Sequence, residues 1–301
     1  MMKLESLATF VMAAESGSIS GAARRLGIAK SVASERLSEL ERELGAKLIQ
    51  RSTRKLSVTE DGQAFLPRAR TILREAAEAT AELTERRGTL VGPLRLSAPV
   101  SFGMLHLGPA LNAFLGENRG IDLTLELDDR FVDVASDGFD AVVRHGPVNN
   151  NRLVAKRLAS SRRLLVASPD YLARCGRPQT PAEIAAHDGI LYANREADWR
   201  FGSAAGWSVV RPRAVLRVNN GVVMRDAAAA GLGIALLPTF FMHEQLADGS
   251  LVHVDIGTEA EGAELFVAYP RERNPSTKVL ALVASLRRSF GDPPYWDRGP
   301  G

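Results

Sequence analysis

The stretch that most constrains this chain is residues 21–45, GAARRLGIAKSVASERLSELERELG, in which two helix-length runs flank a short break at 26–28. In the second run, apolar residues recur at i, i+4, i+7 and i+11, the spacing of one helical face; they are Ala33, Leu37, Leu40 and Leu44. The opposite face carries Lys30, Ser31, Ser34, Glu35 and Ser38. A helix held by one apolar stripe and presenting mostly short polar side chains suits a groove as wide as the DNA major groove.

The residues around this pair of helices complete a small domain. Apolar spacing predicts a first helix over 4–15, followed by helices over about 19–26 and 30–44. Residues 46–58 hold two short β-prone pieces, 47–50 and 56–58, which predict a hairpin with a basic tip. Residues 1–59 contain ten Lys or Arg against six Asp or Glu, whereas the rest of the chain holds 28 against 29. This excess of positive charge is typical of a module that binds a polyanion, although ordinary surface charge also explains it.

A long helix is predicted next, over about 60–87. Thr59 is a good helix cap, and Glu60 and Asp61 are acids beside the positive end of the helix dipole. One narrow apolar stripe with charged flanks suggests that this helix pairs with another copy of the chain. Pro67 removes one amide and predicts a kink near 63–66.

Beyond a linker at about 86–93, strand-like and helix-like segments alternate. The strand-like segments are 94–97, 123–127, 140–144, 162–168, 214–218, 234–238, 251–255 and 265–269, and the helical ones are 102–116, 131–137, 221–230 and 275–290. Such alternation predicts α/β units with a mainly parallel sheet.

Composition narrows the class of protein further. A chain of 301 residues that is 45% hydrophobic is typical of about two globular domains. Its single cysteine, Cys175, excludes an intramolecular disulfide. No apolar run approaches the roughly 18 residues of a membrane span, and Glu5 interrupts the N-terminal apolar run, which favours an amphipathic helix over an export signal. We therefore expect a cytoplasmic protein.

Residues 4–87 resemble the DNA-binding domain of LysR-type transcriptional regulators almost continuously. The motifs that carry the resemblance are Gly17-Ser18, the Ala22-Ala23-Arg24-Arg25-Leu26 segment, the Ser/Ala-rich third helix, the LEREL run before Gly45 and the basic segment ending at Thr59. The resemblance implies a winged helix-turn-helix in which the third helix reads DNA and the wing grips the backbone. The residues implied in DNA binding are Lys30, Ser31, Ser34, Glu35, Arg51, Arg54 and Lys55.

Three residues depart from the family pattern. Lys30 stands where the family usually has Gln, and a lysine in the major groove favours guanine acceptors. Glu35 stands where Arg is frequent, and its carboxylate either accepts from cytosine or points into solvent. Ala29 stands where the family usually has a capping Ser, so the sequence does not fix the residue at which the third helix begins.

Residues 90–301 resemble the effector-binding domain of the same family, whose two-lobed fold is shared with periplasmic solute-binding proteins. The motifs are LRLSAP at 94–99, DAVVRHG at 140–146 and AGLGIALLP at 230–238. The implied organisation is a winged helix-turn-helix over 1–59, a linker and dimerisation helix over 60–89, and an effector domain over 90–301. Lobe one is expected over 90–161 and 267–301, and lobe two over 162–266.

Pockets in such folds lie between the lobes, where strands end and free helix amides favour anions. The effector contacts expected there are Val100, Ser101, Phe102, Asp129, Arg144, His145, Asn194, Trp199, Asn219 and Asn220, with Ser97, Pro99, Arg130, Phe131 and Ser168 beside them. Ser101 and Asn219 serve equally well as helix caps. Apolar side chains beside Arg144 suggest a small organic acid as the effector.

Catalytic and metal motifs are not found. Gly231-x-Gly233 lacks the third glycine of a dinucleotide loop, the five histidines have no metal-ligand spacing, and no GxSxG motif occurs. We therefore expect no catalytic residues, no metal and no cofactor. The leading hypothesis is a homodimeric or homotetrameric regulator that binds promoter DNA and a small-molecule effector, with RNA polymerase as a further partner. The alternatives are an enzyme or a solute-binding domain with an accessory DNA-binding module; the lack of an acid–base or metal cluster weighs against the first, and the lack of an export signal against the second.

Overall fold

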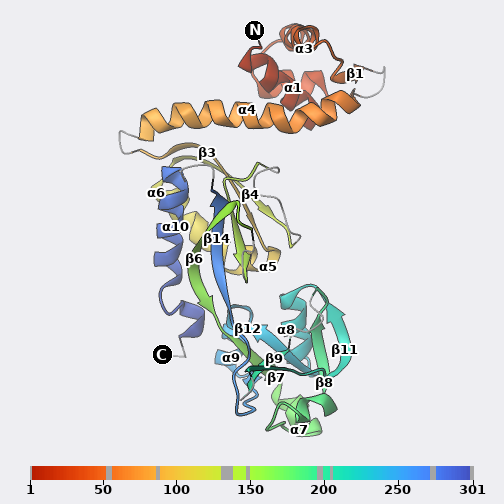
Figure 1. Ribbon diagram of the computed structural model, residues 1–301, viewed down its shortest axis with the longest axis vertical. Helices are drawn as coiled ribbons and strands as arrows, with labels where there is room; N and C mark the ends of the chain where they lie inside the picture. Colours follow the sequence, from red (N-terminus) through yellow and green to blue (C-terminus); the bar gives the residue numbers. More distant parts are fainter. Residues whose placement is uncertain are drawn as a thin grey trace.

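The computed structural model describes residues 2–51, 56–85, 89–129, 138–146, 150–194, 199–203, 206–271 and 276–298. Along the chain, a small helical domain is followed by a long helix, α4, and then by two lobes, each built on its own five-stranded sheet (Figure 1). Helix α4 lies across the end of the first lobe, beside strand β3 (Figure 1). The second lobe lies at the far end of the molecule from the N-terminal domain.

The N-terminal domain is a three-helix unit with a β-hairpin wing. Its elements are α1 (Leu4–Ser16), α2 (Ile19–Arg25), α3 (Lys30–Leu44), β1 (Ile49–Arg51) and β2 (Leu56–Val58). Strands β1 and β2 are antiparallel, with Ile49 opposite Val58. Its core contains Leu7, Phe10 and Leu40, none of which is exposed. The prediction of three helices and a hairpin is confirmed, and some helix ends carry a local signal, such as the Ser18 cap of α2 or the left-handed turn at Gly45 after α3.

A buried carboxylate ties the recognition helix to the wing. Glu41 Oε1 accepts hydrogen bonds from the backbone N–H groups of Leu48 (3.0 Å) and Ile49 (3.1 Å). Its other oxygen accepts from Lys47 Nζ at 2.7 Å. Burial alone would raise the pKa of Glu41, but these hydrogen bonds and the lysine charge outweigh it and hold the pKa below its ordinary value. The end of α3 therefore fixes where β1 begins.

Helix α4 (Glu60–Glu85) continues as one helix through Pro67, and the kink expected near 63–66 stays a prediction. The Thr59 hydroxyl accepts from the Gly62 N–H at 3.0 Å, which is the cap that the sequence indicated. An ion pair between Arg70 and Glu15, with an N···O distance of 2.9 Å, holds α4 against α1. The N-terminal domain is therefore fastened to the first half of the long helix.

Lobe one is a sheet with helices packed on it (Figure 1). The strand order is β4-β3-β5-β14-β6. Its strands are β3 (Val91–Ala98), β4 (Gly120–Leu127), β5 (Ala141–His145), β6 (Leu153–Ser161) and β14 (Ala263–Pro270); its helices are α5 (Val100–Phe102), α6 (Gly108–Glu117) and α10 (Thr277–Phe290), with a π-helical turn at Gly103–Leu107 and a 3₁₀ turn at Tyr295–Asp297. The core includes Leu94, Phe102, Leu265 and Leu286, each at most 1% exposed.

Lobe two repeats the plan with a smaller sheet in the order β11-β8-β12-β7-β13. Its strands are β7 (Arg163–Ala167), β8 (Asp188–Tyr192), β11 (Arg213–Val218), β12 (Ile234–Pro238) and β13 (Val252–His253), with a separate hairpin of β9 (Arg200–Ser203) and β10 (Gly206–Val209); the helices are α7 (Pro169–Cys175), α8 (Gly221–Ala229) and α9 (His243–Asp248), with 3₁₀ turns at Glu183–Ala186 and Thr239–Phe241.

The expectation of a mainly parallel sheet is wrong, because both sheets are mixed. In lobe one, β14 runs antiparallel to both β5 and β6, and in lobe two β7 runs antiparallel to both β12 and β13. Strands β6, β8, β9 and β10 were not anticipated from the sequence. All of β14 belongs to the lobe-one sheet, so the chain re-enters lobe one before residue 263 rather than near 267. The helix predicted over 131–137 lies outside the described residues.

Candidate DNA-recognition and effector sites

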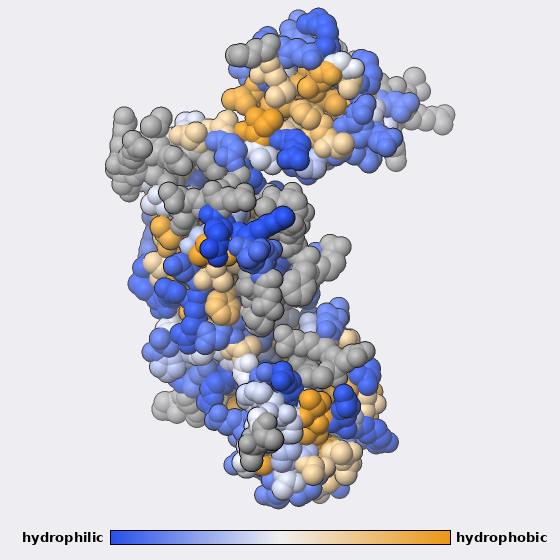
Figure 2. All heavy atoms as spheres, in the orientation of Figure 1, coloured by the Kyte–Doolittle hydropathy of each residue, from blue (hydrophilic) through white to orange (hydrophobic). Residues whose placement is uncertain are grey.

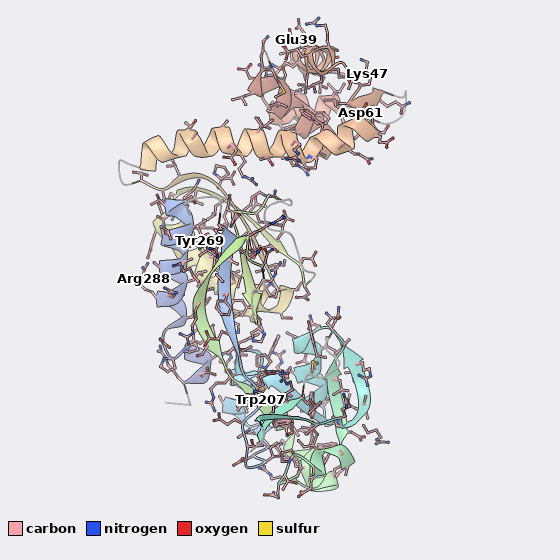
Figure 3. All side chains as sticks on the ribbon, viewed as in Figure 1. Glu39, Lys47, Asp61, Trp207, Tyr269 and Arg288 are labelled. Atoms are coloured by element: carbon pink, nitrogen blue, oxygen red, sulfur yellow. The ribbon has the colours of Figure 1, made fainter. Side chains whose placement is uncertain are left out.

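The polar face of α3 is open to solvent. Lys30, Ser31 and Glu35 are exposed and Ser34 is half-buried, whereas Ala33 and Leu37 are buried beneath them. Helix α3 lies on the side of the domain away from α4 (Figure 1), as the position of Glu39 on this helix also shows (Figure 3). Helix α3 begins at Lys30 although Ala29 makes no side-chain cap, so the missing Ser does not displace the start of the helix.

The wing lies beside α3. Arg51 is the last residue of β1, and Arg54 and Lys55 lie outside the described residues. Lys47, just before the wing, is exposed and bonded to Glu41 (Figure 3). The hydrogen bonds of Glu41 hold the start of β1 against the end of α3.

Parallel pairing gathers the expected lobe-one residues at one sheet edge. Strands β4 and β5 both run parallel to β3, so the ends of all three strands lie together. Ser97 lies at the end of β3 and Ser101 shortly after it, Asp129 lies after β4, and Arg144 and His145 are the last two residues of β5. The structure thus brings these side chains, which were expected to lie near one another, to one edge of the lobe-one sheet.

Arg144 is the main charged group at this edge. Its guanidinium donates to the Ser97 hydroxyl at 3.1 Å and to its neighbour's carbonyl, that of Val143, at 2.8 Å. Burial lowers the pKa of Arg144 from its ordinary value, while the carboxylates of Asp128 and Asp129 act in the opposite direction. Among the described residues its hydrogen bonds go to neutral oxygens only. The cation is therefore partly desolvated, and among those residues no carboxylate is hydrogen-bonded to it.

One expected anion-binding amide is already occupied. The Val100 N–H at the start of α5 donates to Asp129 Oδ1 at 3.0 Å. The carboxylate of the protein itself thus fills the position at which a ligand anion was expected. This amide is therefore not free to bind an anionic ligand.

Lobe two contributes its residues from the ends of β8 and β11, which run parallel. Asn220 caps α8 by accepting from the N–H groups of Val222 (3.0 Å) and Val223 (3.2 Å). Its amide nitrogen donates to the Ser101 hydroxyl at 3.2 Å, which joins the two lobes directly. Asn194, after β8, and Asn219, after β11, are both exposed at the same edge.

Three residues that were expected to contact the effector are not exposed at these sheet edges. Phe102 is 1% exposed and belongs to the core of lobe one, and Trp199 is 2% exposed within the core of lobe two. Ser168 follows the end of β7, and because β7 runs antiparallel to β12, this residue lies at the opposite edge of its sheet. Large aromatic rings pack into cores more readily than they line a polar edge. Arg130 and Phe131 lie outside the described residues.

An aromatic cluster that no sequence pattern indicated joins the two lobes. His106, in the π-helical turn, contacts the Tyr295 hydroxyl through Nδ1 at 2.5 Å and the Phe240 carbonyl through Nε2 at 2.7 Å. Phe240, which follows β12 of lobe two, packs on Phe102 with a ring separation of 5.3 Å. Burial lowers the pKa of His106 to about 4, although its bond to the Phe240 carbonyl opposes the change. No local sequence signal distinguishes this histidine from other polar residues on a helix.

Other kinds of site find no support in the part of the chain that the structure describes. No group of three or more His, Cys, Asp or Glu there could hold a metal ion. In the same residues, no helix combines the length and apolarity needed to cross a membrane.

Comparison with known proteins places both domains in one family. Residues 4–63 match the bacterial regulatory helix-turn-helix protein of the lysR family, and residues 87–291 match the LysR substrate binding domain. The chain is 35% identical over 288 residues to the probable HTH-type transcriptional regulator LtrA of Klebsiella pneumoniae, covering 94% of this chain and 93% of that one. It is 31% identical over 284 residues to an uncharacterized HTH-type transcriptional regulator of Haemophilus influenzae, with 94% and 99% covered.

Solved full-length structures agree. The virulence activator AphB of Vibrio cholerae is 28% identical, with a TM-score of 0.60 over 95% of this chain and 98% of that one. CrgA of Neisseria meningitidis, a LysR-type transcriptional regulator, is 30% identical, with a TM-score of 0.59 over 94% and 98%.

A winged helix-turn-helix joined to a two-lobed α/β domain defines a ligand-controlled DNA-binding protein rather than an enzyme. The chain belongs to the LysR family of bacterial transcriptional regulators. It is a DNA-binding transcriptional regulator whose second domain binds a small-molecule effector.

Proposed function

We propose that α3 enters the major groove of promoter DNA and that Lys30, Ser31, Ser34 and Glu35 contact the bases and nearby phosphates, while Arg51, Arg54 and Lys55 of the wing grip the backbone. The observation that carries this proposal is the exposed polar face of α3 above its buried Ala33 and Leu37. Lysine pairs with guanine and glutamate with cytosine in the major groove. Contacts between cations of the wing and DNA phosphates increase the affinity but contribute little to sequence specificity.

Lys30→Ala is expected to lower specific affinity about 10- to 100-fold, because a good base contact is worth about 1–3 kcal/mol. The measurement is a footprint and binding isotherm on DNA upstream of the protein's own gene at two salt concentrations. Arg54→Ala should instead weaken binding to all duplexes and reduce the salt dependence. Arg42→Ala is the matched control, since Arg42 is an exposed cation about 18 Å further along the same helix. Equal losses in Lys30→Ala and Arg42→Ala would contradict the assignment of Lys30.

The effector is proposed to be a small organic acid whose carboxylate is held by Arg144 and by polar groups where the lobes meet. The desolvated guanidinium of Arg144 and its neutral partners support this choice. We propose further polar contacts to the effector from Ser101, Asn219, Asn220, His145 and Asn194, with Val100 and Asp129 beside them. Because Asn220 and Ser101 join the lobes, a ligand between them would bias one arrangement of the lobes over another.

Arg144→Gln is expected to weaken the binding of any acid found by calorimetry with a panel of mono- and dicarboxylic acids of two to eight carbons. A hydrogen bond to a charged group contributes about 1.5–3 kcal/mol, so affinity should fall at least tenfold. Arg217→Gln, at an exposed arginine of lobe two, should bind as the wild type does. Acids that bind Arg144→Gln and Ser101→Ala as tightly as the wild type would remove the basis of this proposal.

Pairing of α4 with a second copy is proposed to give a homodimer, with a homotetramer as the larger assembly. Hydrophobic residues gather on the face of the N-terminal domain above α4 (Figure 2), and Phe65, Ile72 and Leu73 of α4 are only partly buried. The site of action is proposed to be the cytoplasm, with RNA polymerase as a partner at the promoter. We keep the division into 1–59, 60–89 and 90–301 as the proposed domain organisation.

A further inference from the structure

One apolar side chain stands out on the recognition helix. Val32 is 37% exposed, and among the described residues in the first half of α3 it is the large hydrophobic residue that reaches solvent. It does not belong to the stripe of Ala33, Leu37 and Leu40 that packs into the domain. Val32 is also not among the residues that form the core cluster of this domain.

The position of Val32 adjoins the proposed base-reading residues. At 100° per residue, Val32 lies one step around the helix from Ser31, on the flank opposite Ser34. It also lies in the first turn of the helix, one turn before Glu35 on the same side. A ligand that covers Ser31 and Glu35 would cover Val32 as well.

The chemistry of the groove indicates what an apolar residue can read. Along the major-groove edges, thymine presents a C5-methyl group, whereas the other features are hydrogen-bond donors and acceptors. Lysine, glutamate and serine account for contacts to those donors and acceptors but not to the methyl. We propose that Val32 packs against the C5-methyl group of one thymine in each half-site and thereby selects thymine there. This inference rests on the proposed placement of α3 in the major groove.

The test removes the methyl group alone. In the duplex footprinted by the intact protein, each thymine of the protected half-sites is replaced in turn by 2′-deoxyuridine. At one thymine per half-site we expect affinity to fall about fourfold, the change for losing one buried methyl-sized group. Val32→Ala should bind the thymine and deoxyuridine duplexes equally. Leu44→Ala is the matched control, since Leu44 is 38% exposed at the other end of the same helix, and it should keep the fourfold preference.

The outcomes separate this inference from the proposed function. A normal footprint with no thymine sensitive to deoxyuridine would overturn the role of Val32 and leave the DNA-binding function intact. A preference for thymine that persists in Val32→Ala would assign the methyl contact to another residue and overturn the inference equally. A protein that leaves no footprint on any duplex would overturn the proposed placement of α3, and the role of Val32 with it. The wild-type series needs no variant, so it decides the first outcome even if Val32→Ala folds poorly.

Discussion

Gly62→Ala is expected to destabilise the N-terminal domain by about 3 kcal/mol and to abolish DNA binding. Gly62 lies in the first turn of α4, where the helix passes close to the wing. A Cβ atom there would lie 2.2 Å from the carbonyl oxygen of Leu48 and 2.7 Å from Cγ1 of Val58. The oxygen belongs to the backbone that Glu41 fixes, so it cannot move aside without breaking those hydrogen bonds. The helix would have to shift away from the wing, and the recognition surface with it.

Hydrogen exchange of the N-terminal domain and the footprint on promoter DNA would measure this effect. Gly116→Ala is the matched control, because Gly116 is also helical but a Cβ there would have nothing within 4 Å. Alanine at that position should leave stability unchanged or raise it by about 0.5–1 kcal/mol. Normal exchange protection and a normal footprint in Gly62→Ala would show that the wing yields more easily than its hydrogen bonds indicate.

The same glycine illustrates what sequence could and could not predict. In the N-terminal domain, helix ends follow from local residues, such as Ser18 and Gly45, and the helices lie where the sequence placed them. Gly62 carries no such signal, because its requirement arises from Leu48 and Val58, which reach it only through the folded wing.

The sheets of the lobes also depend on contacts that the sequence does not reveal, here between strands far apart in the chain. The alternation of strands and helices predicted α/β lobes, but the direction of β14 is set by partners more than a hundred residues away. Hydrophobic periodicity does not encode such pairings, which is why the sheets were expected to be mainly parallel.

In the candidate effector site too, some residues could be predicted from the sequence and others could not. Ser101, Arg144 and Asn220 could be anticipated because residues after parallel strands meet at one edge. Phe102 and Trp199 could not be assigned to cores from their types, since aromatic rings occur in cores and in pockets alike. The contact of His106 with Phe240 unites residues of both lobes that no local pattern connects.

The contact between His106 and Phe240 is expected to make the junction between the lobes sensitive to acid. The His106 side chain is 2% exposed, and burial lowers its pKa to about 4 in the folded protein. In the unfolded chain the imidazole has its ordinary pKa of about 6.5. Between these two values the unfolded chain binds a proton that the folded protein does not. The contribution of this residue to stability is therefore complete above pH 6.5 and is lost as the pH falls to about 4, amounting to about 3 kcal/mol at most.

His106→Gln should remove this pH dependence, because glutamine does not titrate yet can still donate to the Phe240 carbonyl. Urea unfolding followed by tryptophan fluorescence suits the measurement, since Trp296 lies 4.8 Å from the His106 ring, centroid to centroid. For the wild type, the urea midpoint should fall steadily from pH 7 to pH 4.5, and for His106→Gln it should fall much less. His243→Gln, which leaves both partners of His106 in place and removes only a minor cause of its low pKa, should retain most of the wild-type slope. Equal slopes in the wild type and His106→Gln would mean that the folded protein accepts the proton at this junction without opening it, and that the lobes are held together by the rings around Phe240 rather than by a neutral imidazole.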